Sequence, residues 1–83
     1  MFQAGQTVTW TTRNKVYVGR VLARVDSGQY INTVIRKIKL ESPSYDWGSN
    51  KDWPPFKPEV SYLVHVEENN KVYWPKVRAL CLI

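Results

Sequence analysis

Residues 61–83, SYLVHVEENNKVYWPKVRALCLI, constrain the fold of this chain more strongly than any other segment. Side chains over residues 62–68 follow the two-residue period of a half-buried β-strand. Asn69 and Asn70 then fit a tight turn, because asparagine adopts positive φ more readily than most residues. Residues 71–74 return as the partner strand, so this part of the chain predicts a β-hairpin.

The residues after the hairpin indicate how the sheet ends. Pro75 has no backbone N–H to donate to a neighbouring strand, and it therefore ends the second strand of the hairpin. Residues 75–79 are long enough for one 3₁₀ turn, and the apolar residues 80–83 supply a final strand. This order predicts a small all-β barrel that is closed by its last strand.

The first quarter of the chain predicts two further strands. Polar and apolar side chains alternate over residues 6–12 and again over residues 16–25, with a turn at residues 13–15. Gly19 lies inside the second strand, where glycine is unfavourable, and it indicates a bend or a bulge at a corner of the barrel.

Residues 30–41 predict a third strand. Val34, Ile38 and Leu40 share one face of such a strand with Arg36, so one charge interrupts the apolar register. A bulge near Arg36, or a guanidinium group that reaches the rim of the barrel, explains this charge. A helix is the competing assignment, and the β-branched content and the lack of a capping residue disfavour it.

Residues 42–59 form a long insertion that carries four of the five prolines. Loops of this length are uncommon in compact domains unless they have a function, and aromatic side chains distinguish this one from a disordered linker. The candidate aromatic binding surface within it, over residues 45–56, is Tyr45, Trp47, Trp53 and Phe56. Three interpretations are open: the segment plugs one end of the barrel, its rings contact a protein partner, or Trp47 and Trp53 stack on the bases of a nucleic acid.

The chain resembles SH3-like small barrels of the Tudor and KOW kind. The resemblance lies in Gly5-Gln6-Thr7-Val8 at the first strand, Gly19-Arg20-Val21 in the second, and the closing residues 62–80. It implies an all-β fold: a five-stranded SH3-like barrel with a long aromatic loop before the fourth strand and one 3₁₀ turn before the last. We expect residues 1–83 to form a single SH3-like domain with the insertion at 42–59.

A second resemblance is to the type II dihydrofolate reductases of plasmids and integrons, which are also short SH3-like chains. Their tail contains a Val-Gln-Ile-Tyr-Pro run followed shortly by Ala-Leu, and here Lys71-Val72-Tyr73-Trp74-Pro75 is followed by Ala79-Leu80. In that family the glutamine and the tyrosine of the run contact substrate and cofactor. Val72 and Trp74 stand at those positions, and valine lacks the amide hydrogen bonds, so the resemblance favours the fold and argues against the activity.

No set of side chains has the composition of a catalytic or metal site. His65 lies mid-strand and is expected at the surface or rim, whereas Cys81 lies in the apolar closing strand and is expected to be buried. One histidine and one cysteine do not make a zinc site, and Asp46 and Asp52 are expected to be solvated loop acids. We therefore expect a non-enzymatic protein with no metal and no cofactor.

The net charge of +5 is concentrated in the first half of the chain. Residues 1–40 contain seven basic side chains and one acidic, whereas residues 41–83 contain five basic and six acidic. This asymmetry favours a polyanion, and we predict nucleic-acid binding through a basic face of the second and third strands, with weak sequence specificity. The candidate nucleic-acid-binding residues are Arg13, Lys15, Arg20, Arg24, Arg36, Lys37 and Lys39.

The alternative partner is a protein or peptide. Tudor-like readers hold cationic groups with clustered aromatic rings, and the 45–56 loop has the composition for this, as in a small interaction protein of a mobile element or phage. No apolar run has the length of a membrane span, and no signal peptide is evident. A single cysteine is typical of a reducing compartment, so a cytoplasmic location is expected.

Overall fold

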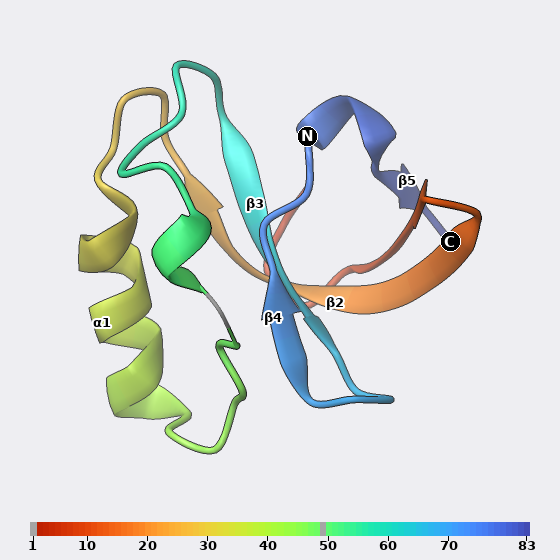
Figure 1. Ribbon diagram of the computed structural model, residues 1–83, viewed down its shortest axis with the longest axis horizontal. Helices are drawn as coiled ribbons and strands as arrows, with labels where there is room; N and C mark the ends of the chain where they lie inside the picture. The colour runs from red at the N-terminus through yellow and green to blue at the C-terminus, as the bar shows by residue number, and fades with distance from the viewer. Residues whose placement is uncertain (1, 49) are drawn as a thin grey trace.

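The computed structural model describes residues 2–48 and 50–83 (Figure 1). Met1 and Ser49, which fall within the predicted 1–83 domain and the predicted 42–59 insertion, lie outside the described residues. The elements in chain order are β1 (Thr7–Thr12), β2 (Lys15–Val25), α1 (Ile31–Glu41), η1 (Asn50–Asp52), β3 (Ser61–Val66), β4 (Lys71–Tyr73), η2 (Val77–Ala79) and β5 (Cys81–Leu82).

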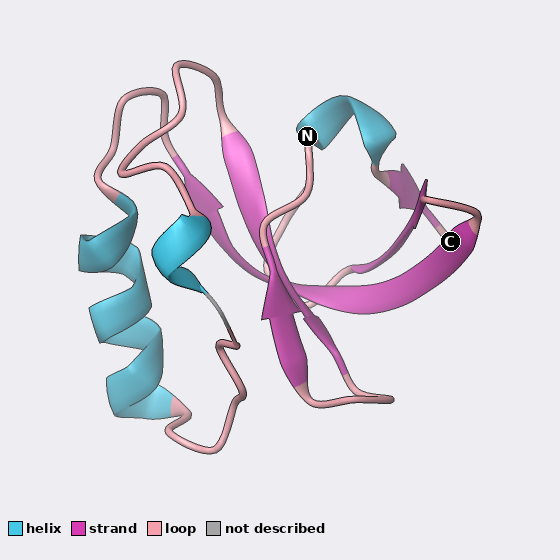
Figure 2. Ribbon diagram, in the orientation of Figure 1, coloured by secondary structure: helices cyan, strands magenta, loops and turns pink. Residues whose placement is uncertain are grey.

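The strands form one antiparallel sheet in the order β4-β3-β2-β1-β5. Five of the predicted strands are confirmed, at residues 7–12, 15–25, 61–66, 71–73 and 81–82. The predicted 3₁₀ turn before the last strand is also confirmed. The sheet curves strongly but remains open, because β4 and β5 are its two edges and do not pair with each other (Figure 2). The fold is therefore mostly β, and the predicted closure into a barrel is not present.

Residues 31–41 form a helix, so the strand predicted at 30–41 is wrong (Figure 2). Its buried residues recur at the three- and four-residue spacing of an amphipathic helix: Ile31, Val34, Ile35 and Ile38. Tyr30 at the N-cap makes no side-chain capping bond, so burial of this apolar face, rather than capping, holds the helix. The same geometry explains Arg36, which lies on the exposed face and interrupts no apolar register.

α1 has 11 residues, and no helix within the described part of the chain has the length and apolar character needed to cross a membrane.

Hydrophobic side chains pack on both faces of the central strands. One cluster fills the concave face and includes Val8, Val21 and Val64. The other covers the opposite face, where α1 packs against Val25 and Leu63. Because successive strand residues point to opposite faces, Leu63 and Val64 belong to different clusters, and β3 is buried on both sides.

Gly19 and an irregularity in β2 set the curvature of the sheet. A Cβ atom at Gly19 would lie 2.6 Å from Val64 Cγ1 and 2.8 Å from the His65 carbonyl oxygen, so only glycine allows β3 to approach this closely. The β2–β3 register shifts between Val21 and Ala23. The predicted bulge therefore lies a few residues beyond Gly19, and glycine at this position serves the close approach of β3.

The segment between α1 and β3 packs along the outer face of the sheet and the edge of β4. The Asp46 N–H donates to the Asn70 carbonyl at 2.9 Å, and the Val72 N–H donates to the Asp46 carbonyl at 3.0 Å. These two hydrogen bonds add residue 46 beside β4 and cover part of an otherwise open strand edge.

Candidate binding groove

The seven predicted nucleic-acid-binding residues are all exposed, but the structure does not bring them together as one stripe. Arg13 and Lys15 lie at the β1–β2 turn, and Arg36, Lys37 and Lys39 lie on α1, at the opposite side of the sheet (Figure 1). The predicted stripe required residues 30–41 to pair with β2, whereas the strand that pairs with β2 there is β3. In a helix, Lys37 and Lys39 are two residues apart and point to different sides.

Two of the three predicted basic residues of β2, Arg20 and Arg24, are each paired with an acid. Arg20 lies 3.8 Å from a carboxylate oxygen of Glu67, and Arg24 lies 3.1 Å from one of Asp26. These exposed pairs are weak in energy, but each acid cancels much of the positive field of its arginine.

Three of the four aromatic residues of the predicted loop surface, Tyr45, Trp47 and Trp53, belong to or pack against the outer hydrophobic cluster, and Phe56 lies apart from it. Trp47 is buried against α1, and Trp53 is half-buried beside it, with ring centroids 6.4 Å apart. Tyr45 stacks on His65, and Phe56 stands edge-on against Tyr30 in an exposed pair. The packing of Trp47 and Trp53 is on the outer face of the sheet, not at an end of a barrel.

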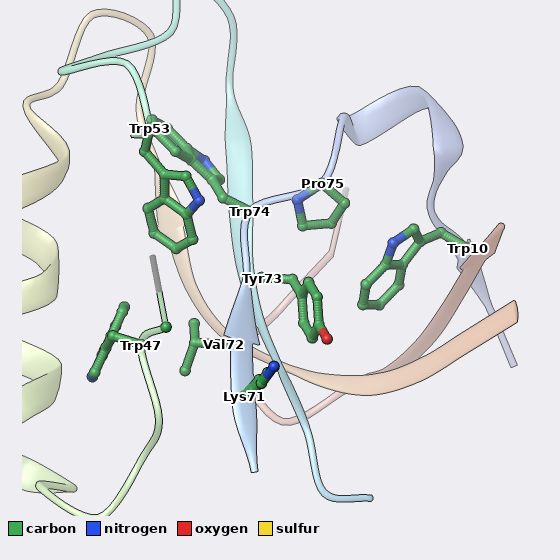
Figure 3. A pocket seen from close by; sticks show the side chains of 9 residues that line it. Trp10, Trp47, Trp53, Lys71, Val72, Tyr73, Trp74 and Pro75 are labelled. Atoms are coloured by element: carbon green, nitrogen blue, oxygen red, sulfur yellow. The ribbon is translucent and has the colours of Figure 1, made fainter. Parts of the chain in front are cut away.

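A groove crosses the edge of β4 between the two hydrophobic clusters (Figure 3). All four tryptophans of the chain line its first part, which has a volume of about 380 Å³. Trp47, Trp53 and Val72 lie on one side of β4, whereas Tyr73, Pro75 and Trp10 lie on the other (Figure 3). The two sides differ because Val72 and Tyr73 are consecutive in the strand and point in opposite directions.

The groove continues past Pro75 into a second part of about 410 Å³ that shares Trp10, Trp74 and Pro75 with the first. We call the two parts together the aromatic groove. Among the described residues that line it, the charged side chains are Lys71 in the first part and Lys57 and Lys76 in the second. Its lining therefore combines aromatic rings with positive charge.

Ring contacts extend the groove on both sides. Trp53 lies 5.6 Å from Trp74 on one side, and Tyr73 lies 5.8 Å from Trp10 on the other. Tyr17 stacks on Trp10 at 5.2 Å and contacts Tyr73 at 5.0 Å. Contacts at these distances fix the rings in place before any ligand arrives.

Three lysine ammonium groups lie over aromatic rings. Lys57 Nζ is 4.4 Å from the centre of Trp74 and donates to the Trp74 carbonyl at 3.1 Å. Lys15 lies 5.0 Å above Tyr17, and Lys39 lies 5.8 Å above Trp47. The faces of these rings are thus already covered by cations, and a cationic ligand would be repelled there.

The pKa of Lys57 is lowered from the ordinary lysine value of 10.5. The main cause is partial burial, which removes water from the ammonium group; the carboxylate of Glu59 raises the pKa and the charge of Lys76 lowers it. Lys57 therefore loses its charge at a lower pH than an ordinary lysine.

His65 and Cys81, the remaining candidate residues, do not line the groove. His65 is half-buried, with Nε2 2.9 Å from Asn70 Oδ1. Cys81 is exposed, so the expectation of a buried thiol is wrong. It lies in β5, a two-residue strand at the edge of the sheet, and both residues of this strand are exposed to solvent. No cluster of three histidine, cysteine or acidic side chains lies among the described residues.

Sequence reasoning missed Trp10, Tyr73, Trp74, Lys57 and Lys71 as one site. Alternation placed Trp10 on a buried strand face, and Pro75 marked the end of β4, but these residues are far apart in the chain. The strand order places β4 three positions from β1, and only the curvature of the sheet brings Trp10 to the groove.

The chain matches no protein-family model, no curated protein and no solved structure.

Proposed function

We propose that this chain is a non-enzymatic module that binds nucleic acid along the aromatic groove. The observation that carries the proposal is the composition of the groove, with tryptophan and tyrosine rings alongside Lys57, Lys71 and Lys76. Aromatic rings contact bases and lysines contact phosphates, and few other ligands use both along one groove.

The exposed basic residues of the flanks support the same partner. Lys15 lies over Tyr17, which contacts the groove residues Trp10 and Tyr73, and Lys39 lies over Trp47 of the groove lining. Further exposed positive charge comes from Arg13, Arg36 and Lys37. Long-range attraction by these charges accelerates association with a polyanion. Arg20 and Arg24 contribute less, because Glu67 and Asp26 lie beside them.

A salt series tests the proposal. Wild-type protein is titrated with single- and double-stranded oligonucleotides while intrinsic tryptophan fluorescence is followed, between about 50 and 200 mM salt. Affinity should fall steeply with salt, because each phosphate contact releases a counterion. Absence of binding at low salt, or an affinity that does not change with salt concentration, would contradict the proposal.

Two matched substitutions locate the contacts. Lys71→Gln should lower the slope of log affinity against log salt by about 0.7 to 0.9, the value for one phosphate contact. Arg24→Gln removes the same charge from another exposed residue, which lies outside the groove next to Asp26, and should change the slope less. If the two substitutions changed the salt slope equally, the phosphate contacts would not be concentrated in the aromatic groove.

The alternative is a protein or peptide partner in the same groove. Grooves lined by tryptophan, tyrosine and proline also bind extended, proline-containing peptides. The three lysines over aromatic rings argue against a cationic peptide, so a peptide partner here would be acidic.

A further inference from the structure

We infer that the aromatic groove takes single-stranded nucleic acid, with unpaired bases on Trp53 and Tyr73 and phosphates on Lys71 and Lys57. The inference rests on the proposed function and names the form of nucleic acid that the groove accepts. It follows from which rings are accessible, how they are held, and where the ammonium groups lie.

Trp53 and Tyr73 are the two half-buried rings of the groove, on opposite sides of β4 (Figure 3). The other three aromatic residues of its lining, Trp10, Trp47 and Trp74, are at most 9% exposed. They form the base of the groove and offer little free ring surface. A ligand ring can therefore stack only on Trp53 and Tyr73 among the aromatic residues that line the groove.

Both accessible rings are held in position from behind. Trp53 contacts Trp47 and Trp74, while Tyr73 contacts Trp10 and receives a hydrogen bond at its hydroxyl from Asn69 Nδ2 at 2.9 Å. Because these rings are already ordered, little side-chain conformational entropy is lost when a ligand stacks on them.

Positive charge lies next to Tyr73 and over the ring that contacts Trp53. Lys71 lies in the first part of the groove next to Tyr73 (Figure 3), and Lys57 lies over Trp74, the neighbour of Trp53. A chain that alternates planar bases with phosphates matches this alternation of rings and ammonium groups. These donors are lysines, which lack the planar fork that reads base edges, so binding should tolerate many sequences.

A duplex does not match the groove in the same way. The bases of a duplex are stacked on one another and present only their edges, so the base faces are not free to stack on Trp53 or Tyr73. Phosphates of a duplex can still contact the exposed lysines, but without the stacking contribution. The preference for a single strand should therefore disappear when the accessible rings are removed.

The first experiment uses wild-type protein alone and needs no substitution. Fluorescence titrations at one low salt concentration compare a thymidine oligonucleotide of about 10 nucleotides, a duplex of equal length, and a poly-glutamate peptide of similar charge. We expect the single strand to bind at least about 10-fold more tightly than the other two, with quenching of tryptophan fluorescence because all four tryptophans line the groove.

The second experiment removes the rings. Trp53→Leu and Tyr73→Leu should each weaken single-strand binding by about 5-fold to 100-fold while leaving the salt slope unchanged, because stacking releases no counterions. Tyr30→Leu removes a ring that is 64% exposed and outside the groove, and it should leave affinity unchanged. Circular dichroism and thermal unfolding establish that each variant is folded.

The outcomes separate this inference from the proposed function. Equal binding of single strand and duplex, or ring variants that bind like wild type, overturns the single-strand inference and leaves nucleic-acid binding in place. Tighter binding of poly-glutamate than of either oligonucleotide overturns it in favour of an acidic peptide. Failure of all nucleic acids to bind at low salt overturns the inference and the proposed function together.

Discussion

Trp74 contributes to the core and to the groove at once. Its Nε1 donates to Ser61 Oγ at 2.8 Å, and both residues are buried, which fixes the indole ring against β3. Its carbonyl oxygen accepts a hydrogen bond from Lys57 Nζ, and its ring lies under the same ammonium group. The position of a charged side chain in the groove thus depends on a hydrogen bond in the core.

Lys57 should give binding a pH dependence that an ordinary lysine lacks. Its pKa lies below 10.5, and an anionic ligand favours the charged form, so its contribution is complete below the lowered pKa and is lost as pH rises through it. As pH rises toward 10.5, affinity of the wild type should therefore fall more than that of Lys57→Arg, whose guanidinium stays charged.

The measurement is oligonucleotide affinity for both proteins in a pH series that ends at 10.5, with Lys76→Arg as a control at an exposed position of the same groove. Parallel pH profiles for the wild type and Lys57→Arg would contradict the prediction.

At the level of elements, α1 and β4 decide where the site lies. α1 covers the outer face of the sheet and packs in one hydrophobic cluster with Trp47, which lines the groove. β4 is an edge strand, so the side chains on both of its faces are accessible from the same direction. A central strand would not allow this, because neighbouring strands would cover its edges.

Substitution of Ile35 distinguishes the helix from the strand that alternation predicts. In α1, Ile35 is 6% exposed, and Ile35→Ala should lower the free energy of unfolding by about 2 to 4 kcal/mol. Lys37→Ala, on the exposed face, should change it by less than about 0.5 kcal/mol. Urea unfolding measures both. In a strand, residues 35 and 37 share a face, so similar small effects at both positions would argue against the helix.

Across the whole molecule, β3 joins the two hydrophobic clusters. It pairs with β2 on one side and β4 on the other, and Leu63 and Val64 are completely buried on its opposite faces. Opening of β3 therefore disrupts both clusters, whereas opening of β5 disrupts only a short edge pairing with β1.

Native-state hydrogen exchange should follow this arrangement. The amides of Leu63 and Val64 should exchange only through global unfolding, and those of Cys81 and Leu82 should exchange through local opening that is less sensitive to denaturant. Exchange rates measured over a series of denaturant concentrations test this. Comparable protection of β5 and β3 would show that the molecule opens as one unit.

The sequence predicted the local elements whose pattern is short and alternating. Residues 7–12, 15–25 and 61–82 carry their own strand periods, turn residues and strand-ending proline, so these elements follow from nearby residues. The helix was missed because residues 30–41 contain many β-branched side chains, and their burial at helical spacing depends on the sheet that they cover.

By itself, then, the sequence determined the hairpins, the 3₁₀ turn, the glycine at the bend, and a surplus of basic side chains. Only the tertiary structure decided which of those side chains meet. The curved β4-β3-β2-β1-β5 sheet brings Trp10 beside Tyr73 and Pro75, and the 42–59 segment carries Trp53 and Lys57 to Trp74. The physical reason is that the groove consists of contacts between residues far apart in the chain, and these depend on how the faces of the sheet are buried.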